Sequence, residues 1–305
     1  MATYPPQGLS YTDPLLTASR FLANPLFVAR RIQELADLRY VGNLLLSGRQ
    51  ETTGGAVGYE TVEGIFADAA PEVVSPGAEY TMTTISDGPA GLARVVKSGK
   101  DTLVTDEAIK RRNMDPVEKG LRKLVNSQGK AIDGSVISLI ASAVTASAAA
   151  GTAWATSTTI LRDILKAKAA IQANGLGYEP NVLLVDDNAW ALLASDPTIA
   201  AAMAREDKSN PVYSGRFSIL AGLEVIPTST ANLPGAVGTK AWVLDTNQLG
   251  FIATEDLGGG YQQATDLVQS KVMRVDENDA WRLRARANFA PVVTDPLAGY
   301  AITGI

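Results

Sequence analysis

The longest run of apolar residues at helical spacing lies in the second quarter of the chain. Its members are Val117, Leu121, Leu124, Ile132, Val136, Leu139 and Ala143. They recur every three or four residues and predict an amphipathic helix from Pro116 to about Ala148. Asp115 as N-cap, Pro116 at the first helical position and Glu118 at the third form a capping-box variant. A shorter helix is predicted to begin just before it, at Thr105.

Between residues 157 and 268 short helical and strand patterns alternate, which is typical of an α/β segment. The predicted helices run from Ser157 or Thr158 to Asn174, from Asn188 to Ala194 and from Thr198 to Arg205, and the predicted strands are Asn181–Asp186, Leu220–Ile226, Trp242–Asp245 and Phe251–Thr254. The glycine-containing stretch 175–180 follows a helix and lacks the third glycine of a dinucleotide turn, so it is interpreted as a helix end and loop.

The C-terminal part of the chain returns to β structure. From residue 280 apolar and polar residues alternate strictly, with Trp281, Leu283, Ala285, Ala287 and Phe289 on one face and Arg282, Arg284, Arg286 and Asn288 on the other. A period of two predicts a half-buried strand. The last fifteen residues are almost uncharged. They are therefore expected to pack into a sheet rather than to fray.

Two segments carry too few large apolar residues to form a core. Residues 1–23 contain four prolines or glycines and predict an extended arm, whose Tyr4, Tyr11 and leucines favour docking on a surface over a disordered tail. Asn24-Pro25 then predicts the start of a helix that reaches about Asp37. Residues 48–97 predict a long two-stranded projection, with β-type runs at 62–66 and 80–85, that rests on another surface.

Composition limits the chemistry that is available to this chain. Its 305 residues contain no cysteine and no histidine, so disulfides and thiolate–zinc sites are excluded and the commonest general base is absent. The formal net charge of −5 gives no overall basic signature for nucleic acid. No signal peptide and no apolar stretch of membrane-spanning length are found, so the protein is expected in a cytoplasm.

Asp186 and Asp187 are the residues that most resemble a catalytic or metal-binding pair, because they end a predicted strand of an α/β segment. A simpler reading makes Asp186 the N-cap of the next helix and places Asp187 in its first turn. Trp190 and Leu193 would then face the core of that segment. The lack of histidine favours this second interpretation.

Other motifs fail on their spacing. Ser98-Gly99-Lys100-Asp101 lacks the first glycine and the closing hydroxyl residue of a phosphate loop, and Asp276–Asp279 lacks ligands of a calcium loop and predicts a polar turn. No serine elbow of the G-x-S-x-G type occurs. The arginine row at 282, 284 and 286 is compatible with phosphate binding or with a solvated face. An acidic protein partner is favoured, because aligned arginines repel one another unless carboxylates neutralise them.

The order of these segments resembles the major capsid protein of tailed bacteriophages. The resemblance covers essentially the whole chain and rests mainly on LVTDEAI at 103–109, DPVEKGLRKLV at 115–125, NVLLVDDNAWALL at 181–193, GLEVIPT at 222–228 and VDENDAWRLRARANFAPVV at 275–293. It implies an α+β fold made of an N-arm (1–46), an E-loop (47–97), a P-domain with a long spine helix (98–155 and 269–305) and an A-domain (156–268).

The resemblance implies a shell protein that assembles as pentamers and hexamers into an icosahedral phage head around double-stranded DNA, formed in a bacterial host. Arm and E-loop would lie on neighbouring subunits. Scaffolding, portal and decoration proteins are possible partners, with DNA contacted non-specifically and no membrane. No enzymatic activity, catalytic residue, cofactor or metal is expected. An encapsulin-type compartment shell, or a carboxylate-dependent enzyme centred on Asp186 and Asp187, are the alternatives.

Two departures from the family pattern carry expectations. Some members crosslink an E-loop lysine to a P-domain asparagine, but residues 1–96 contain no lysine here, and Lys97 is the first in the chain. Covalent crosslinking is therefore not expected. Some members also begin with a cleaved scaffolding segment. This sequence begins at the arm, so any scaffold is expected to be a separate protein.

Overall fold

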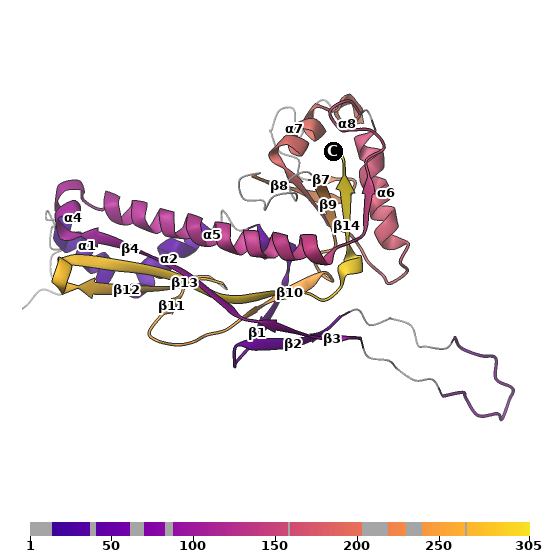
Figure 1. The fold of residues 1–305 in the computed structure, drawn as a ribbon, viewed down its shortest axis with the longest axis horizontal. Helices are drawn as coiled ribbons and strands as arrows, with labels where there is room; N and C mark the ends of the chain where they lie inside the picture. The colour runs from indigo at the N-terminus through magenta and orange to yellow at the C-terminus, as the bar shows by residue number, and fades with distance from the viewer. Residues whose placement is uncertain are drawn as a thin grey trace, which may run out of the picture. The chain divides into compact units, whose positions relative to one another are not determined.

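The computed structural model describes residues 14–36, 41–61, 70–82, 88–157, 159–202, 219–229, 240–265 and 267–305. The structure combines helices with sheets that contain parallel and antiparallel strand pairs, which confirms the α+β class (Figure 1). The chain divides into two compact units. The first contains residues 1–40, 95–132 and 254–289, and the second contains 41–94, 133–253 and 290–305.

The first unit is built on an antiparallel sheet. Its helices are α1 (Pro14–Ala23), α2 (Pro25–Ala36), α4 (Asp106–Arg112) and the first part of α5 (Asp115–Ala143), and its strands are β4 (Val96–Thr105), β11 (Gln262–Gln263), β12 (Gln269–Val275) and most of β13 (Ala280–Val293). The strand order is β11-β12-β13-β4, and ten residue pairs join β13 to β4. Apolar residues of β13 and the buried face of α5 form the core of this unit.

The predicted long helix is confirmed as α5, although it is shorter than expected at its C-terminal end. It stops at Ala143, and residues 147–149 form β5 instead of continuing the helix. Pairing of β5 with a C-terminal strand provides backbone hydrogen bonds that the weak helical preference of this serine- and alanine-rich stretch does not outweigh. Asp115 lies inside the helix and forms an ion pair with Lys119 (2.5 Å), so the predicted capping role is wrong.

The predicted extended arm is wrong for residues 14–23, which form helix α1. Pro14 occupies its first position, where a missing N–H costs nothing. Ala18 and Leu22, one helical turn apart, are buried, and α1 packs against α2 and α4 of the same unit. Residues 1–13, with Tyr4 and Tyr11, lie outside the described residues. Helix α2 starts as predicted, since the Asn24 carboxamide accepts a hydrogen bond from Leu26 N.

The second unit contains a six-stranded mixed sheet. Its strand order is β5-β14-β9-β6-β8-β7, with β6 and β8 parallel and with β14 parallel to β5. The bounds are β5 (Ser147–Ala149), β6 (Val182–Asp186), β7 (Ile219–Leu220), β8 (Leu223–Thr228), β9 (Lys240–Leu244) and β14 (Gly299–Thr303); the helices are α3 (Gly42–Leu45), α6 (Ile160–Gln172), α7 (Asp187–Ser195) and α8 (Pro197–Ala202). The prediction that the apolar C-terminus packs into a sheet is confirmed by β14.

One predicted strand of this unit is a hairpin. Residues 220–226 do not run straight, because β7 and β8 pair antiparallel around Ala221 and Gly222. Both turn residues have positive φ (55° and 77°), as a two-residue hairpin requires. The apolar flanks concealed the turn in the sequence. The helix expected at 198–205 is α8, and its predicted last residues lie outside the described part of the chain.

The predicted projection contains a two-stranded ribbon, also in the second unit. Strands β2 (Ala56–Glu60) and β3 (Ala90–Arg94) pair antiparallel over five residue pairs, and β1 (Gly48–Glu51), which precedes them, pairs with β10 (Gly250–Thr254). The expected strand at 80–85 is wrong for residues 80–82, which have no regular structure. Residues 83–85 and the expected strand at 62–66 lie outside the described residues.

Candidate functional site

The strand-to-helix junction at Asp186 and Asp187 gives the two carboxylates separate environments. Asp186 is buried and its Oδ1 accepts a hydrogen bond from Ala189 N at 2.7 Å, which confirms the predicted N-cap of α7. Asp187 is exposed in the first turn. The helix buries Ala189 and Leu193, whereas Trp190 is only half-buried. Asp186 is therefore occupied by a structural hydrogen bond, and the pair does not share one site.

The acidic turn at 276–279 is the second place where the sequence offers carboxylates. It forms a short 3-10 helix, η3 (Asp276–Asn278), followed by Asp279 in a left-handed conformation. This confirms the predicted polar turn. Among the described residues, no group of three or more acidic side chains is arranged to hold a metal ion.

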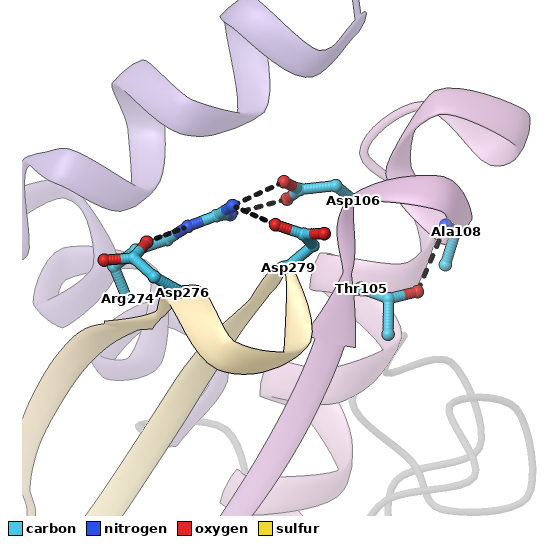
Figure 2. A network of polar contacts seen from close by, with 6 residues as sticks. All are labelled: Thr105, Asp106, Ala108, Arg274, Asp276 and Asp279. Carbon is cyan, nitrogen blue, oxygen red and sulfur yellow. Dashed lines mark hydrogen bonds and ion pairs between the residues drawn. The ribbon is translucent and has the colours of Figure 1, made fainter.

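A single arginine gathers the carboxylates around this turn (Figure 2). Arg274 donates from both Nη atoms to the two oxygens of Asp106 at 2.7 Å, and from Nε to Asp276 at 3.1 Å. Asp279 lies 3.8 Å from the same guanidinium, and the Asp106 N–H donates to the carbonyl of Asp279. These hydrogen bonds raise the pKa of Arg274 above its usual value. The cluster thus ties the start of α4 to the turn between β12 and β13.

Sequence reasoning recognised the two ends of this cluster but not the residue that joins them. Thr105 caps α4 as predicted, accepting from Ala108 N at 3.3 Å (Figure 2). Arg274 carries no motif of its own. The only available signal is its place two residues before an acidic turn, where it lies opposite Trp281 in the strand register.

The arginine row on β13 is neutralised from within the chain. Arg282 and Arg284 both donate to Asp101 of β4, at 2.5 Å and 2.6 Å from their Nε atoms, because Asp101 lies directly opposite Arg284. The hydrogen bond from Arg284 holds the pKa of Asp101 below its usual value and raises the pKa of Arg284. The sequence-based expectation that a second protein supplies the carboxylate is therefore wrong for these two arginines.

Arg286, the third member of the row, is buried and holds a glycine-rich loop. Its Nε donates to Gln269 at 2.9 Å and its Nη2 donates to the carbonyl of Gly258 at 2.7 Å. Its guanidinium carbon lies 3.5 Å from the ring centre of Tyr261, in a cation–π contact. Burial acts to raise the pKa of Tyr261, but nearby cations, Arg284 foremost, lower it overall. The row is thus a structural network rather than an open anion site.

The rejected phosphate-loop motif lies on a strand. Ser98, Gly99 and Lys100 belong to β4 and pair with β13, so their backbone N–H groups do not curve around an anion. At Gly99 a side chain would meet the carbonyl of Ala285 at 3.2 Å. Close strand packing, not phosphate binding, explains this glycine.

The charged clusters found among the described residues join elements of one chain to each other. The chain belongs to the phage capsid protein family, whose model matches residues 90–302. The resemblance to tailed-phage major capsid proteins is thereby confirmed, and the chain is a component of the virion shell.

Solved structures agree with this assignment at the level of the fold. A phage-related protein from Bordetella bronchiseptica superposes with a TM-score of 0.61 at 13% identity, covering 92% of this chain and 97% of that one. The capsid structure of cyanophage P-SCSP1u gives 0.61 at 14% identity, over 84% and 85% of the two chains. A virus-like particle from Pyrococcus furiosus gives 0.56 at 12% identity, over 96% and 100%.

No curated protein matches the sequence. Within the described residues, no helix is long and apolar enough to cross a membrane.

Proposed function

We propose that this chain assembles as pentamers and hexamers into an icosahedral head that encloses double-stranded DNA in a bacterial host. Family membership supports the shell role. In this proposal residues 1–46 are the N-arm, 47–97 the E-loop, 98–155 and 269–305 the P-domain, and 156–268 the A-domain. The role is purely structural, without catalysis or cofactor.

The observation that carries assembly is the exposure of large apolar side chains beyond the β2–β3 ribbon. Tyr80 and Met82 are 82% and 93% exposed, and Val73 is fully exposed. Exposing large apolar side chains to water is unfavourable, by about 25 cal/mol per Å² of apolar surface that a neighbour could cover. A second subunit that covers these side chains gains this free energy, whereas the isolated subunit does not.

Electron microscopy of the purified protein tests assembly directly. We expect capsomers and closed particles from the wild-type chain, and a strongly reduced particle yield from Tyr80→Ser combined with Met82→Ser. Because both side chains are exposed, the melting temperature of the variant should stay close to that of the wild type. Leu257→Ser, at a half-exposed leucine of the first unit, is the matched control. A wild-type protein that remains a monomer at all concentrations contradicts the proposal.

Covalent crosslinking between subunits is not part of this proposal. Residues 1–96 contain no lysine that could form an isopeptide bond. Denaturing electrophoresis of intact particles should therefore show only the monomer band of about 32 kDa. A ladder of higher bands would show that another residue supplies the crosslink.

An encapsulin-type compartment shell is the second candidate, because the chain also aligns with the whole of a virus-like particle subunit. The two differ in their contents. Nuclease-resistant DNA in particles from infected cells supports the phage head, and enclosed protein without DNA supports the compartment. Separate scaffolding, portal and decoration proteins would co-purify with assembly intermediates in the first case.

A further inference from the structure

One face of helix α5 carries a row of cations with no apolar residue among them. Its members, called the basic stripe below, are Lys119, Arg122, Lys123 and Lys130. At 3.6 residues per turn these positions lie within about 100° of one another around the helix. All four are exposed, and the residues on the opposite side, such as Leu121 and Leu124, are buried in the core of the first unit.

Three of the four cations of the basic stripe have no carboxylate partner among the described residues. Lys119 pairs with Asp115, but Arg122, Lys123 and Lys130 form no ion pair with any described residue. Lysines and arginines that lie one turn apart repel each other. Unlike Arg274 and Arg284, which are held by acids of the same unit, these three side chains are available to an external anion.

The local charge contrasts with that of the whole chain. Residues 106–130 contain seven Lys or Arg against four Asp or Glu, a net charge of +3, whereas the complete chain has −5. One of these four acids, Asp106, is held by Arg274, and another, Glu118, by Arg31. The remaining helix from Ala131 to Ala143 contains no lysine or arginine. Within α5 the lysines and arginines are therefore confined to residues 119–130, and the other three of the seven lie on α4.

We propose that the basic stripe binds the phosphate backbone of duplex DNA without sequence preference. This inference rests on the proposed function, in which DNA fills the shell. The stripe has no aromatic side chain for base stacking, and Asn126 is its only amide, so it contacts phosphates rather than bases. From Lys123 to Lys130 the helix rises about 10 Å, close to the roughly 12 Å width of the major groove. Lys123 and Lys130 thus reach phosphates on both sides of a groove.

The competing occupant is an acidic segment of a second copy. Residues 50–93 contain seven acids and no lysine or arginine. That segment, however, also exposes Val73, Tyr80 and Met82, which need an apolar surface to be covered. The basic stripe offers none, since its exposed residues are charged or polar. A polyanion without apolar side chains fits it better.

The salt dependence of DNA binding tests the proposal. The full-length chain, kept below the concentration at which particles form, is titrated against a short mixed-sequence DNA duplex by fluorescence anisotropy between about 50 and 200 mM salt. Each phosphate contact contributes about 0.9 to the slope of log K against log salt. Arg122→Gln combined with Lys123→Gln should therefore reduce the slope by about 2, and a duplex of different sequence should bind equally well.

A matched control comes from helix α6 of the second unit. Arg162 and Lys166 are also exposed cations one turn apart, so Arg162→Gln combined with Lys166→Gln removes the same charge elsewhere. This variant should keep the wild-type slope. Equal slopes for the stripe variant and the wild type overturn the proposal, as does an equal loss in the control.

Electron microscopy of the same variants separates this inference from the proposed function. If the stripe variant still forms particles but its binding to DNA depends less steeply on salt, the result supports DNA binding by the basic stripe. Loss of particles with unchanged DNA binding would assign the basic stripe to a contact between subunits and overturn it. A wild-type protein that forms no particles contradicts the proposed function instead, whatever the DNA result.

Discussion

The antiparallel sheet of the first unit and the β2–β3 ribbon of the second unit are both built from antiparallel strands, but they differ in how much of their apolar surface is buried. Strand β13 is paired on both sides, and its Leu283 is 1% exposed. The ribbon has five residue pairs and a single buried apolar residue, Val57, while Leu92 is 67% exposed. A two-stranded ribbon alone is marginal in water. The sheet therefore stabilises the subunit, whereas the ribbon depends on what covers it.

The polar side chains of the two regions show the same contrast. In the sheet, Arg282 and Arg284 meet Asp101 across the strand pair, so the charges are neutralised inside the unit. In the segment beyond the ribbon, the one hydrogen bond that Glu72 makes to a described residue comes from the hydroxyl of Thr81, at 3.2 Å. Elements that satisfy their own groups define the fold of one chain. Elements that leave them exposed are suited to contacts between chains.

The largest expected effect compares the same substitution in both regions. Leu283→Ala should lower the free energy of unfolding by about 2–5 kcal/mol, because it leaves a cavity in a closed core. Leu92→Ala removes an exposed side chain and should change it by no more than about 0.5 kcal/mol. Chemical denaturation followed by circular dichroism measures both. Similar losses of unfolding free energy in the two variants would mean that the ribbon is covered within the subunit. The contrast between the buried sheet and the exposed ribbon would then be wrong.

Helix α1 belongs to a segment that the sequence predicted to lack a core, but the structure packs it into the first unit. Its buried leucine gives the second largest expected change in stability. Leu22→Ala should cost about 2–4 kcal/mol, because Leu22 is 1% exposed within its own unit. Leu26→Ala, at a 62% exposed position of α2, is the control and should be nearly neutral. The same denaturation measurement applies. A neutral Leu22→Ala would restore the sequence-based view that residues 14–23 are stabilised only by neighbours.

The sequence predicted best where the periodicity was long and the capping residues were clear. Helix α5, the strand β13 and the cap at Asp186 follow from repeated spacing and short-range hydrogen bonding, which are local properties. The C-terminal end of α5 was missed because it depends on the pairing of β5 with β14, far away in the chain. The turn at Ala221 is local, and it was missed because apolar residues flank it on both sides. Helix α1 was missed because prolines and glycines before residue 14 obscured a short amphipathic pattern.

The charged clusters were less predictable than the fold. Nothing local connects Asp101 with Arg284, which are 183 residues apart, or Asp106 with Arg274, which are 168 apart. The first pair arises from the register of β4 against β13, which a one-residue slip would destroy. The second joins the first residue of α4 to β12, the other strand that pairs with β13. Without β4 in the prediction, the arginines appeared to need a second protein. Side-chain alternation thus identified the arginine face, but only the sheet topology identified its partner.

Asp133 holds the segment that leads into the ribbon and makes the stability of the protein depend on pH. This buried carboxylate on α5 accepts from Gly42 N, at the start of α3, at 2.8 Å, and burial raises its pKa to about 6. The folded state therefore binds more protons than the unfolded state between about pH 4 and 6, and stability falls as pH rises through this window. The full effect is roughly 2–3 kcal/mol.

Asp133→Asn should remove this contribution to the pH dependence. The difference in unfolding free energy between wild type and variant is measured at several pH values from about 4 to 7. We expect it to shift in favour of the variant as pH rises, because the asparagine carries no charge to bury. A difference that is constant with pH would show that the carboxylate is hydrated when the protein is folded.

The smallest expected effect concerns the polar face of the sheet. Asp101→Asn should cost about 1–2 kcal/mol at neutral pH, because Arg282 and Arg284 lose their shared carboxylate. The pKa of Asp101 is depressed in the folded state, so its contribution is present above the unfolded value of about 3.9 and is lost as pH falls below it. Asp276→Asn, at a much more exposed ion pair, is the control and should cost less than about 0.5 kcal/mol. Equal costs for the two variants would mean that the sheet gains no more from its internal charge pairing than a surface turn does.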